Sequence, residues 1–192
     1  MVETGKKRIA IFASGSGTNA ENIFSYFSED ERVIIDSLWS NKTDAYALVR
    51  AQKHGVETFV FSRDQFYNST HIIDTLRKRK VDLVVLAGFL WLIPDNLVKN
   101  YTIINIHPAL LPKYGGKGMY GMKVHKAVVE NAEKESGISI HYVNENYDEG
   151  KMIFQARCLV EPGDTPEQVA EKVHALEYEH FPKVIEEVLF KL

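Results

Sequence analysis

The sequence lacks the features that several classes of protein require. Its single cysteine, Cys158, excludes a disulfide within the chain, and its apolar neighbours favour a buried thiol over a reactive one. No apolar run reaches membrane-spanning length and no signal-peptide pattern is present, so we expect a cytoplasmic protein without a membrane partner. The formal net charge of -3 gives no basic field for nucleic acid, and the seven histidines show no metal-ligand spacing. A small anionic ligand could still bind, through a local site.

What the sequence has is a regular alternation of short apolar runs with amphipathic segments, which is typical of a doubly wound α/β fold. Strands are expected at residues 8–13, 33–39, 56–61, 81–87, 101–105, 137–143 and 152–160. Helices are expected from Ala20 to Phe27, up to Gly55, over about 67–79, after Pro94, over 124–131, and from Pro166 to the C-terminus. Thr18 with Glu21 and Thr165 with Gln168 resemble capping boxes, and Pro182 predicts a kink in the last helix.

A glycine-rich loop, Ser14 to Asn19, joins the first expected strand to the first expected helix. Backbone N–H groups and the helix dipole at such a junction form an anion site. Glycines there allow a phosphate to approach the backbone closely. Gly15, Gly17 and Ala20 also fit the dinucleotide spacing G-x-G-x-x-A. That interpretation needs an acidic residue at the end of the second strand, which instead reads Trp39-Ser40-Asn41-Lys42. A phosphate monoester is therefore favoured over NAD, with a plain turn as the alternative.

Asn105 and His107 lie two residues apart at the end of an expected strand, so their side chains point to the same side of it. An amide beside an imidazole can stabilise an oxyanion while it handles a proton. Taken alone, a histidine before a proline at a strand end is more often structural. Asp148 alone is equally consistent with an ordinary loop acid, since turns favour aspartate. The residues by themselves leave these alternatives open.

The segment Asn105-Ile106-His107-Pro108-Ala109-Leu110-Leu111-Pro112 resembles the active-site segment of the formyltetrahydrofolate-using transferases. Asp148, five residues after Val143, resembles the catalytic aspartate of that family. The Ser14 to Asn19 loop is similar to the phosphate loop of one branch, the phosphoribosylglycinamide formyltransferases. The resemblance extends from Arg8 to about Leu189. It implies the formyltransferase fold, a seven-stranded, mostly parallel sheet with helices on both faces and a Rossmann-like N-terminal half.

The resemblance also implies a reaction and the residues that carry it out. The formyl group of 10-formyltetrahydrofolate would pass to the amine of 5′-phosphoribosylglycinamide, in de novo purine biosynthesis, without a metal. Asn105 and protonated His107 would stabilise the oxyanion, and Asp148 would keep His107 charged and accept the proton of the amine. The acceptor's phosphate and ribose would be held by Ser16, Gly17, Thr18, Asn19, Arg63 and Glu177, with Glu179 as a rival of Glu177. The folate pocket would comprise Leu90, Trp91, Leu92, Ile93, Asn105, Val143, Asn144 and Asp148.

One domain over residues 1–192 is expected, with phosphate or nucleotide binding in about 1–100 and catalysis and folate binding in about 101–192. Two residues depart from the family pattern: Trp91 stands where relatives commonly carry an arginine, and Ala109 replaces a serine found in many members. The glycine-rich segment 115–121 is expected to close on a ligand or to be mobile without one.

Other functions stay open at this point. Methionyl-tRNA formyltransferase shares the Asn-x-His segment. Members of that family have a longer chain with an additional C-terminal tRNA-binding domain, for which 192 residues leave no room. Formyltetrahydrofolate deformylase uses water in place of the amine, and it typically carries a further N-terminal domain. A NAD-dependent reductase and a catalytically idle nucleotide-binding module are alternatives from other classes. The sequence does not decide between a monomer and a homodimer.

Overall fold

The computed structural model describes residues 5–192, so residues 1–4 of the expected domain lie outside it. Its strands are β1 (Lys7–Phe12), β2 (Val33–Ser40), β3 (Glu57–Val60), β4 (Leu83–Leu86), β5 (Thr102–His107), β6 (Glu135–Tyr142) and β7 (Met152–Leu159). Its helices are α1 (Thr18–Phe27), α2 (Tyr46–Lys53), α3 (Arg63–Tyr67), α4 (His71–Lys78), α5 (Asp95–Asn100), α6 (Met122–Glu130) and α7 (Pro166–Leu189).

The strands within residues 5–192 form one seven-stranded sheet in the order β3-β2-β1-β4-β5-β6-β7. Strands β1 to β5 pair in parallel, whereas β6 runs antiparallel to both of its neighbours. The central strand β4 is buried along its whole length, as an apolar parallel strand covered on both faces should be. The expected doubly wound, mostly parallel sheet is confirmed.

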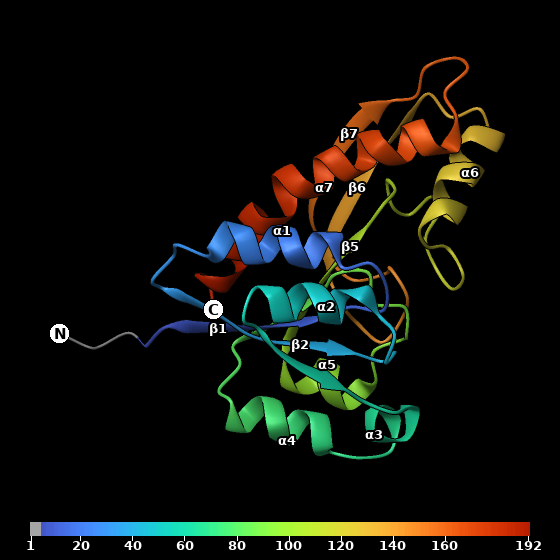
Figure 1. Ribbon diagram of the computed structural model, residues 1–192. Coiled ribbons are helices and arrows are strands. Elements are labelled where there is room, and N and C mark those ends of the chain that lie inside the picture. The colour runs from blue at the N-terminus through green and yellow to red at the C-terminus, as the bar shows by residue number, and fades with distance from the viewer. Residues whose placement is uncertain (1–4) are drawn as a thin grey trace.

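Helices cover both faces of the sheet, with α1, α2 and α7 on one side and α3, α4 and α5 on the other (Figure 1). Because successive side chains of β1 point to opposite faces of the sheet, this strand packs against the helices on both faces. Ile9 and Ile11 pack beneath the first group of helices with Phe181 of α7, while Phe12 joins Trp39 in the core on the opposite face. Helix α6 packs against α7 near the end of the sheet where β5 terminates (Figure 1).

The helix predicted over about 67–79 is confirmed as α4, which begins later than expected, at His71, and ends at Lys78. Helix α3 was not predicted. It begins at Arg63, where Ser62 and Gln65 form a reciprocal capping box that the sequence analysis missed. The expected box at Thr165 and Gln168 is confirmed.

Two further details of the sequence analysis need correction. The expected capping box of Thr18 and Glu21 is wrong: Gly17 is the N-cap of α1, and the Glu21 carboxylate forms an ion pair with Arg50 instead. Cys158, expected to be buried, is half-buried on β7, and this burial raises the pKa of its thiol. Helix α7 continues through Pro182 to Leu189.

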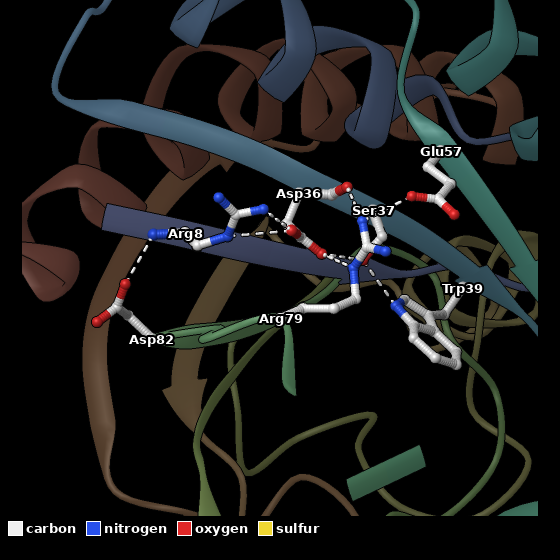
Figure 2. A network of polar contacts seen from close by, with 7 residues as sticks. All are labelled: Arg8, Asp36, Ser37, Trp39, Glu57, Arg79 and Asp82. Carbon is white, nitrogen blue, oxygen red and sulfur yellow. Dashed lines mark hydrogen bonds and ion pairs between the residues drawn. The ribbon is translucent and has the colours of Figure 1, made fainter. Parts of the chain in front are cut away.

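The buried carboxylate of Asp36 on β2 joins this strand to Arg8 of β1 and to Arg79 at the end of α4 (Figure 2). It accepts hydrogen bonds from Arg8 on β1, from the Nε of Arg79 after α4 (2.6 Å) and from the Ser37 hydroxyl (2.8 Å). Asp36 sits where the register of β1 and β2 shifts, since Ile9 pairs with Ile35 but Ala10 pairs with Ser37. Burial alone would raise the pKa of Asp36, but the hydrogen bonds from both arginines and from the hydroxyl hold it below its usual value.

Asp36→Asn is expected to lower the free energy of unfolding at neutral pH by roughly 2–4 kcal/mol, the scale of breaking a buried ion pair. The two arginines keep some exposure, which limits the loss. Because the folded pKa lies below the unfolded one, this stabilisation is complete at neutral pH and is lost as the pH falls through the folded value. Urea denaturation measures the effect, with Asp95→Asn as the control, since Asp95 forms an exposed pair with Lys99 worth less than about 1 kcal/mol. Equal losses in both variants would contradict the account of this network.

Candidate active site

A cavity of about 540 Å³ opens at the carboxyl ends of β1, β4 and β5. Open α/β sheets bind their ligands at this end, where the loops after neighbouring strands meet. The wall is built from segments far apart in the chain: residues 15–19, 86–93, 105–108, 116–121 and 146–148, with His125, His141, Val143, His174 and Glu177.

The loop after β1 forms one end of this cavity. Gly17 has a φ of +76°, and a Cβ there would lie 2.6 Å from the Cα of Ala47 in α2, so only glycine fits. Ser14 anchors the loop from beneath, because its hydroxyl donates to Asn41 Oδ1 (2.7 Å) and accepts the N–H of Leu90 (3.1 Å). Helix α1 begins without a side-chain cap among the described residues, so the N–H groups of its first turn remain available to an anion.

Glu177 of α7 lies beside this loop. Its carboxylate accepts a hydrogen bond from Asn19 Nδ2 at 2.9 Å, and burial raises the pKa of the Glu177 carboxyl. Its rival in the sequence analysis, Glu179, is exposed and is not part of the cavity wall. The cavity therefore brings together Glu177 and the loop residues Ser16, Gly17, Thr18 and Asn19.

Asp148 is the centre of a cluster of polar side chains at the end of β5. Its Oδ2 accepts the backbone N–H of Gly116 at 2.9 Å and lies 3.5 Å from Nδ1 of His107. Its Oδ1 lies 3.4 Å from the amide nitrogen of Asn105 and 3.5 Å from Nε2 of His141. The three residues selected from the sequence thus meet at one point, although the turn that carries Asp148 is more than 40 residues from β5 in the chain.

The charges of this cluster differ from the sequence expectation. Nε2 of His107 lies 2.7 Å from the carbonyl oxygen of Tyr114, which can only accept, so Nε2 carries a proton. Burial lowers the pKa of His107, and the nearby Asp148 only partly offsets it. For Asp148, burial acts to raise the pKa, but the neighbouring imidazoles of His141 and His107 and the hydrogen bond from the Gly116 N–H hold the pKa below its usual value. The free protein at neutral pH therefore pairs a neutral His107 with an ionised Asp148, and not the charged His107 that the sequence analysis expected.

His141 is a buried residue of the cluster that the sequence analysis missed. Its Nδ1 lies 2.9 Å from the carbonyl oxygen of Tyr142, so Nδ1 is the protonated nitrogen and Nε2 is free to accept. Nε2 lies 3.2 Å from the amide nitrogen of Asn105 and so fixes which way that amide points. The available signal was the alternation of Ser139 and His141 with isoleucines in the expected strand 137–143, which puts both polar residues on one face.

Leu90, Trp91, Leu92, Ile93 and Val143, which were predicted to form a folate pocket, also line the cavity. Asn144, predicted to join them, is not part of the wall. Arg63, predicted to reach the phosphate, is exposed on α3, where its guanidinium lies 4.8 Å from the ring centre of Tyr67 and 5.5 Å from that of Trp91. The Tyr67 hydroxyl donates to the carbonyl of Leu92 (2.9 Å), which ties α3 to this wall.

Residues 7–185 match the family described as formyl transferase. The chain belongs to the formyltransferase family. Among its relatives, phosphoribosylglycinamide formyltransferase of Bacillus subtilis is 35% identical, over 95% of this chain and 95% of its own length. The enzyme of the same name from Haemophilus influenzae is 37% identical, over 93% of this chain and 85% of its own length. Both of these relatives are thus named phosphoribosylglycinamide formyltransferase.

Solved structures of this formyltransferase branch share the fold. Glycinamide ribonucleotide transformylase 1 from Symbiobacterium toebii superposes with a TM-score of 0.88 at 30% identity, over 98% of this chain and 90% of that one. The Anaplasma phagocytophilum enzyme gives a TM-score of 0.85 at 34% identity, over 97% and 88%. Some relatives are longer: a chloroplastic enzyme from Arabidopsis thaliana is 40% identical over 95% of this chain, which spans 65% of that relative's length. The chain likewise spans 62% of the chloroplastic relative from Vigna unguiculata.

Two negative findings concern residues 5–192. No group of three or more histidine, cysteine, aspartate or glutamate side chains in this range is arranged to hold a metal ion. Over the same range, none of the helices combines the length and the apolar character needed to cross a membrane.

Proposed function

We propose that this formyltransferase moves the formyl group of 10-formyltetrahydrofolate to the amine of 5′-phosphoribosylglycinamide. The observation that carries the proposal is that one cavity contains both an uncapped, glycine-lined helix start and the Asn105, His107 and Asp148 cluster. The names of the relatives from Bacillus subtilis and Haemophilus influenzae support the same acceptor. Formyl folate and the ribonucleotide are the small-molecule partners. A cytoplasmic location stays a prediction, since the plant relatives are named chloroplastic.

The acceptor occupies the end of the cavity near α1. Its phosphate lies against the N–H groups at the start of the helix, where the backbone dipole favours an anion. Glu177 accepts hydrogen bonds from the ribose hydroxyls, since its buried carboxylate faces the same cavity. The Oδ1 atom of Asn19 is buried and has no hydrogen-bond partner among the described residues, so it can accept a further bond from the ligand.

The donor occupies the opposite end. A folate has a flat pterin ring with polar edges, and its site needs an apolar slot with a few placed hydrogen-bond groups. Leu90, Leu92, Ile93 and Val143 supply the apolar surface. The turn at residues 146–148 closes this end and brings Asp148 to the junction between the two substrates.

The reaction then proceeds by addition and elimination at the formyl carbon. The acceptor amine attacks that carbon, a C–N bond forms, and the carbonyl oxygen becomes an oxyanion to which the Asn105 amide donates. The contact of that amide with Asp148 is long, at 3.4 Å, so the amide can turn one N–H toward the oxyanion. The ionised Asp148 and the unprotonated Nδ1 of His107 take up the proton of the amine, directly or through water. The bond from the formyl carbon to N10 breaks, and N10 receives a proton as tetrahydrofolate leaves.

Tetrahydrofolate release with and without the ribonucleotide tests this function against its alternatives. The protein is incubated with 10-formyltetrahydrofolate, first alone and then with 5′-phosphoribosylglycinamide. Release that depends on the ribonucleotide is the expected result. Equal release in both arms identifies a deformylase, and no release in either arm identifies a binding module, so both outcomes contradict the proposal.

A further inference from the structure

The segment 115–121, here called the glycine flap, connects the catalytic cluster to α6, and its residues 116–121 line the cavity. At its start, the backbone N–H of Gly116 donates a hydrogen bond to Asp148, and at its end Gly121 is the N-cap of α6. Gly116, Gly118 and Gly121 all have positive φ, so the flap takes a path that other residues rarely follow. Lys117 lies within it, is exposed, and is part of the cavity wall.

Lys117 stands out when the charges of the cavity are compared. Among the wall residues that the structure describes, it is the only lysine or arginine, whereas Asp148 and Glu177 are both acids. His125 does not supply a cation, because burial and then the neighbouring His174 lower its pKa to about 4. A phosphate monoester carries nearly two negative charges at neutral pH, and a helix N-terminus offers only about half a positive charge. The cavity therefore needs a further cation to hold such a ligand.

The flap lies toward the acceptor end of the cavity. It leads directly into α6, whose His125 ring packs 6.2 Å from the ring of His174 on α7. His174 lies one helical turn before Glu177, which hydrogen-bonds Asn19 in the phosphate loop. Nδ1 of His125 is buried, lines the cavity and has no hydrogen-bond partner within residues 5–192, so this end also presents an unused polar atom to a ligand.

The neighbouring lysines on either side of the flap already have partners. Lys113 pairs with Glu133 at 2.8 Å, and the ammonium group of Lys123 lies 3.3 Å from the Tyr120 hydroxyl. Neither residue is part of the cavity wall. Lys117 has no ion pair within the described part of the chain, and its four-carbon side chain can move to follow a ligand.

We infer that Lys117 binds the 5′-phosphate of the acceptor and draws the glycine flap over it. The inference rests on the proposed function and adds a residue that determines specificity for a phosphorylated acceptor. In this account, binding of the substrate's phosphate causes the glycine flap to close over the cavity. The ammonium group contributes a charge-assisted hydrogen bond from above, opposite the N–H groups of α1.

Comparison of Lys117→Gln with wild type tests the inference through two forms of the acceptor. With 5′-phosphoribosylglycinamide, the variant should lose roughly 10- to 100-fold in kcat/KM, the range of one hydrogen bond to a charged group. With the dephosphorylated riboside, the loss should stay below about twofold, because the partner of the lysine is missing. The KM for the folate donor should not change. Lys117→Arg should restore most of the activity with the phosphorylated acceptor.

Lys113→Gln is the matched control, since it removes a lysine near the flap that is paired outside the cavity. Equal losses with both acceptors, no loss with either, or a rise confined to the donor KM would each overturn the inference. Calorimetric binding of inorganic phosphate to wild type and Lys117→Gln gives a readout that does not need turnover, with weaker binding expected in the variant. A wild-type protein that makes no product refutes the proposed function, while the phosphate titration still decides the role of Lys117.

Discussion

Asp148→Asn should lower kcat by roughly 10³-fold, within the range for loss of a catalytic base, while the substrates still bind. The carboxylate is the one group that touches all the others in the cluster: His107, His141, Asn105 and the N–H of Gly116. An asparagine keeps the size of the side chain but cannot take a proton or balance the charge that develops on the attacking amine. Single-turnover kinetics with saturating substrates measure this loss in the chemical step directly.

Two comparisons show whether the loss is chemical. Glu149→Gln, at the exposed neighbouring position, should keep wild-type turnover and thereby controls for the loss of one acidic residue in this turn. Asn105→Ala should lower kcat by roughly 10²-fold, the scale of a lost oxyanion donor. His107→Ala should also lower kcat by roughly 10²-fold, because a proton acceptor is lost. Turnover of Asp148→Asn within about tenfold of wild type would contradict its role as the proton acceptor.

Gly17→Ala is expected to damage both the fold and the acceptor site. A Cβ at this position would lie 2.6 Å from both the Cα and the Cβ of Ala47, and the φ of +76° is itself unfavourable for alanine. Overpacking and strain together should lower the free energy of unfolding by roughly 2–4 kcal/mol. The protein can relieve the clash only by moving the start of α1 away from α2. We expect kcat/KM for the acceptor to fall by roughly 10²-fold, the effect of a displacement of about 1 Å at a binding group.

Gly55→Ala separates the two causes. Gly55 also has a positive φ, of +70°, but a Cβ there meets no atom within 4 Å, and the residue is not part of the cavity wall. It should cost about 1–2 kcal/mol in stability and leave the acceptor KM unchanged. If Gly17→Ala behaves like Gly55→Ala in both measurements, the close packing of the loop on α2 is not what shapes the phosphate site.

The sequence was sufficient where local patterns determine structure. Apolar runs such as Leu83–Leu86 predict buried parallel strands, and the two-residue spacing of Asn105 and His107 puts both side chains into the cavity. The glycines of the loop predict a close approach of backbone and ligand, and Gly17 indeed packs against α2. These features depend on residues that are near one another in the chain.

The sequence was insufficient where distant segments meet. The role of His141 depends on the register that pairs it with Asn105 across β5 and β6, which no local pattern specifies. The protonation of His107 depends on its burial, which lowers its pKa, and on the Tyr114 carbonyl, which faces Nε2. Neither can be read from the sequence near His107. Arg63 was predicted at the phosphate, but packing of α3 places it over Trp91 and Tyr67.

Transfer of a labelled formyl carbon tests the central claim most directly. Wild-type protein is mixed with 10-formyltetrahydrofolate labelled at the formyl carbon and with 5′-phosphoribosylglycinamide, and the products are followed by mass spectrometry. We predict that the label appears on the amine of the ribonucleotide in step with tetrahydrofolate formation, and that Asp148→Asn slows both together. Label recovered as free formate, or retained on the folate while the ribonucleotide is present, would contradict the account.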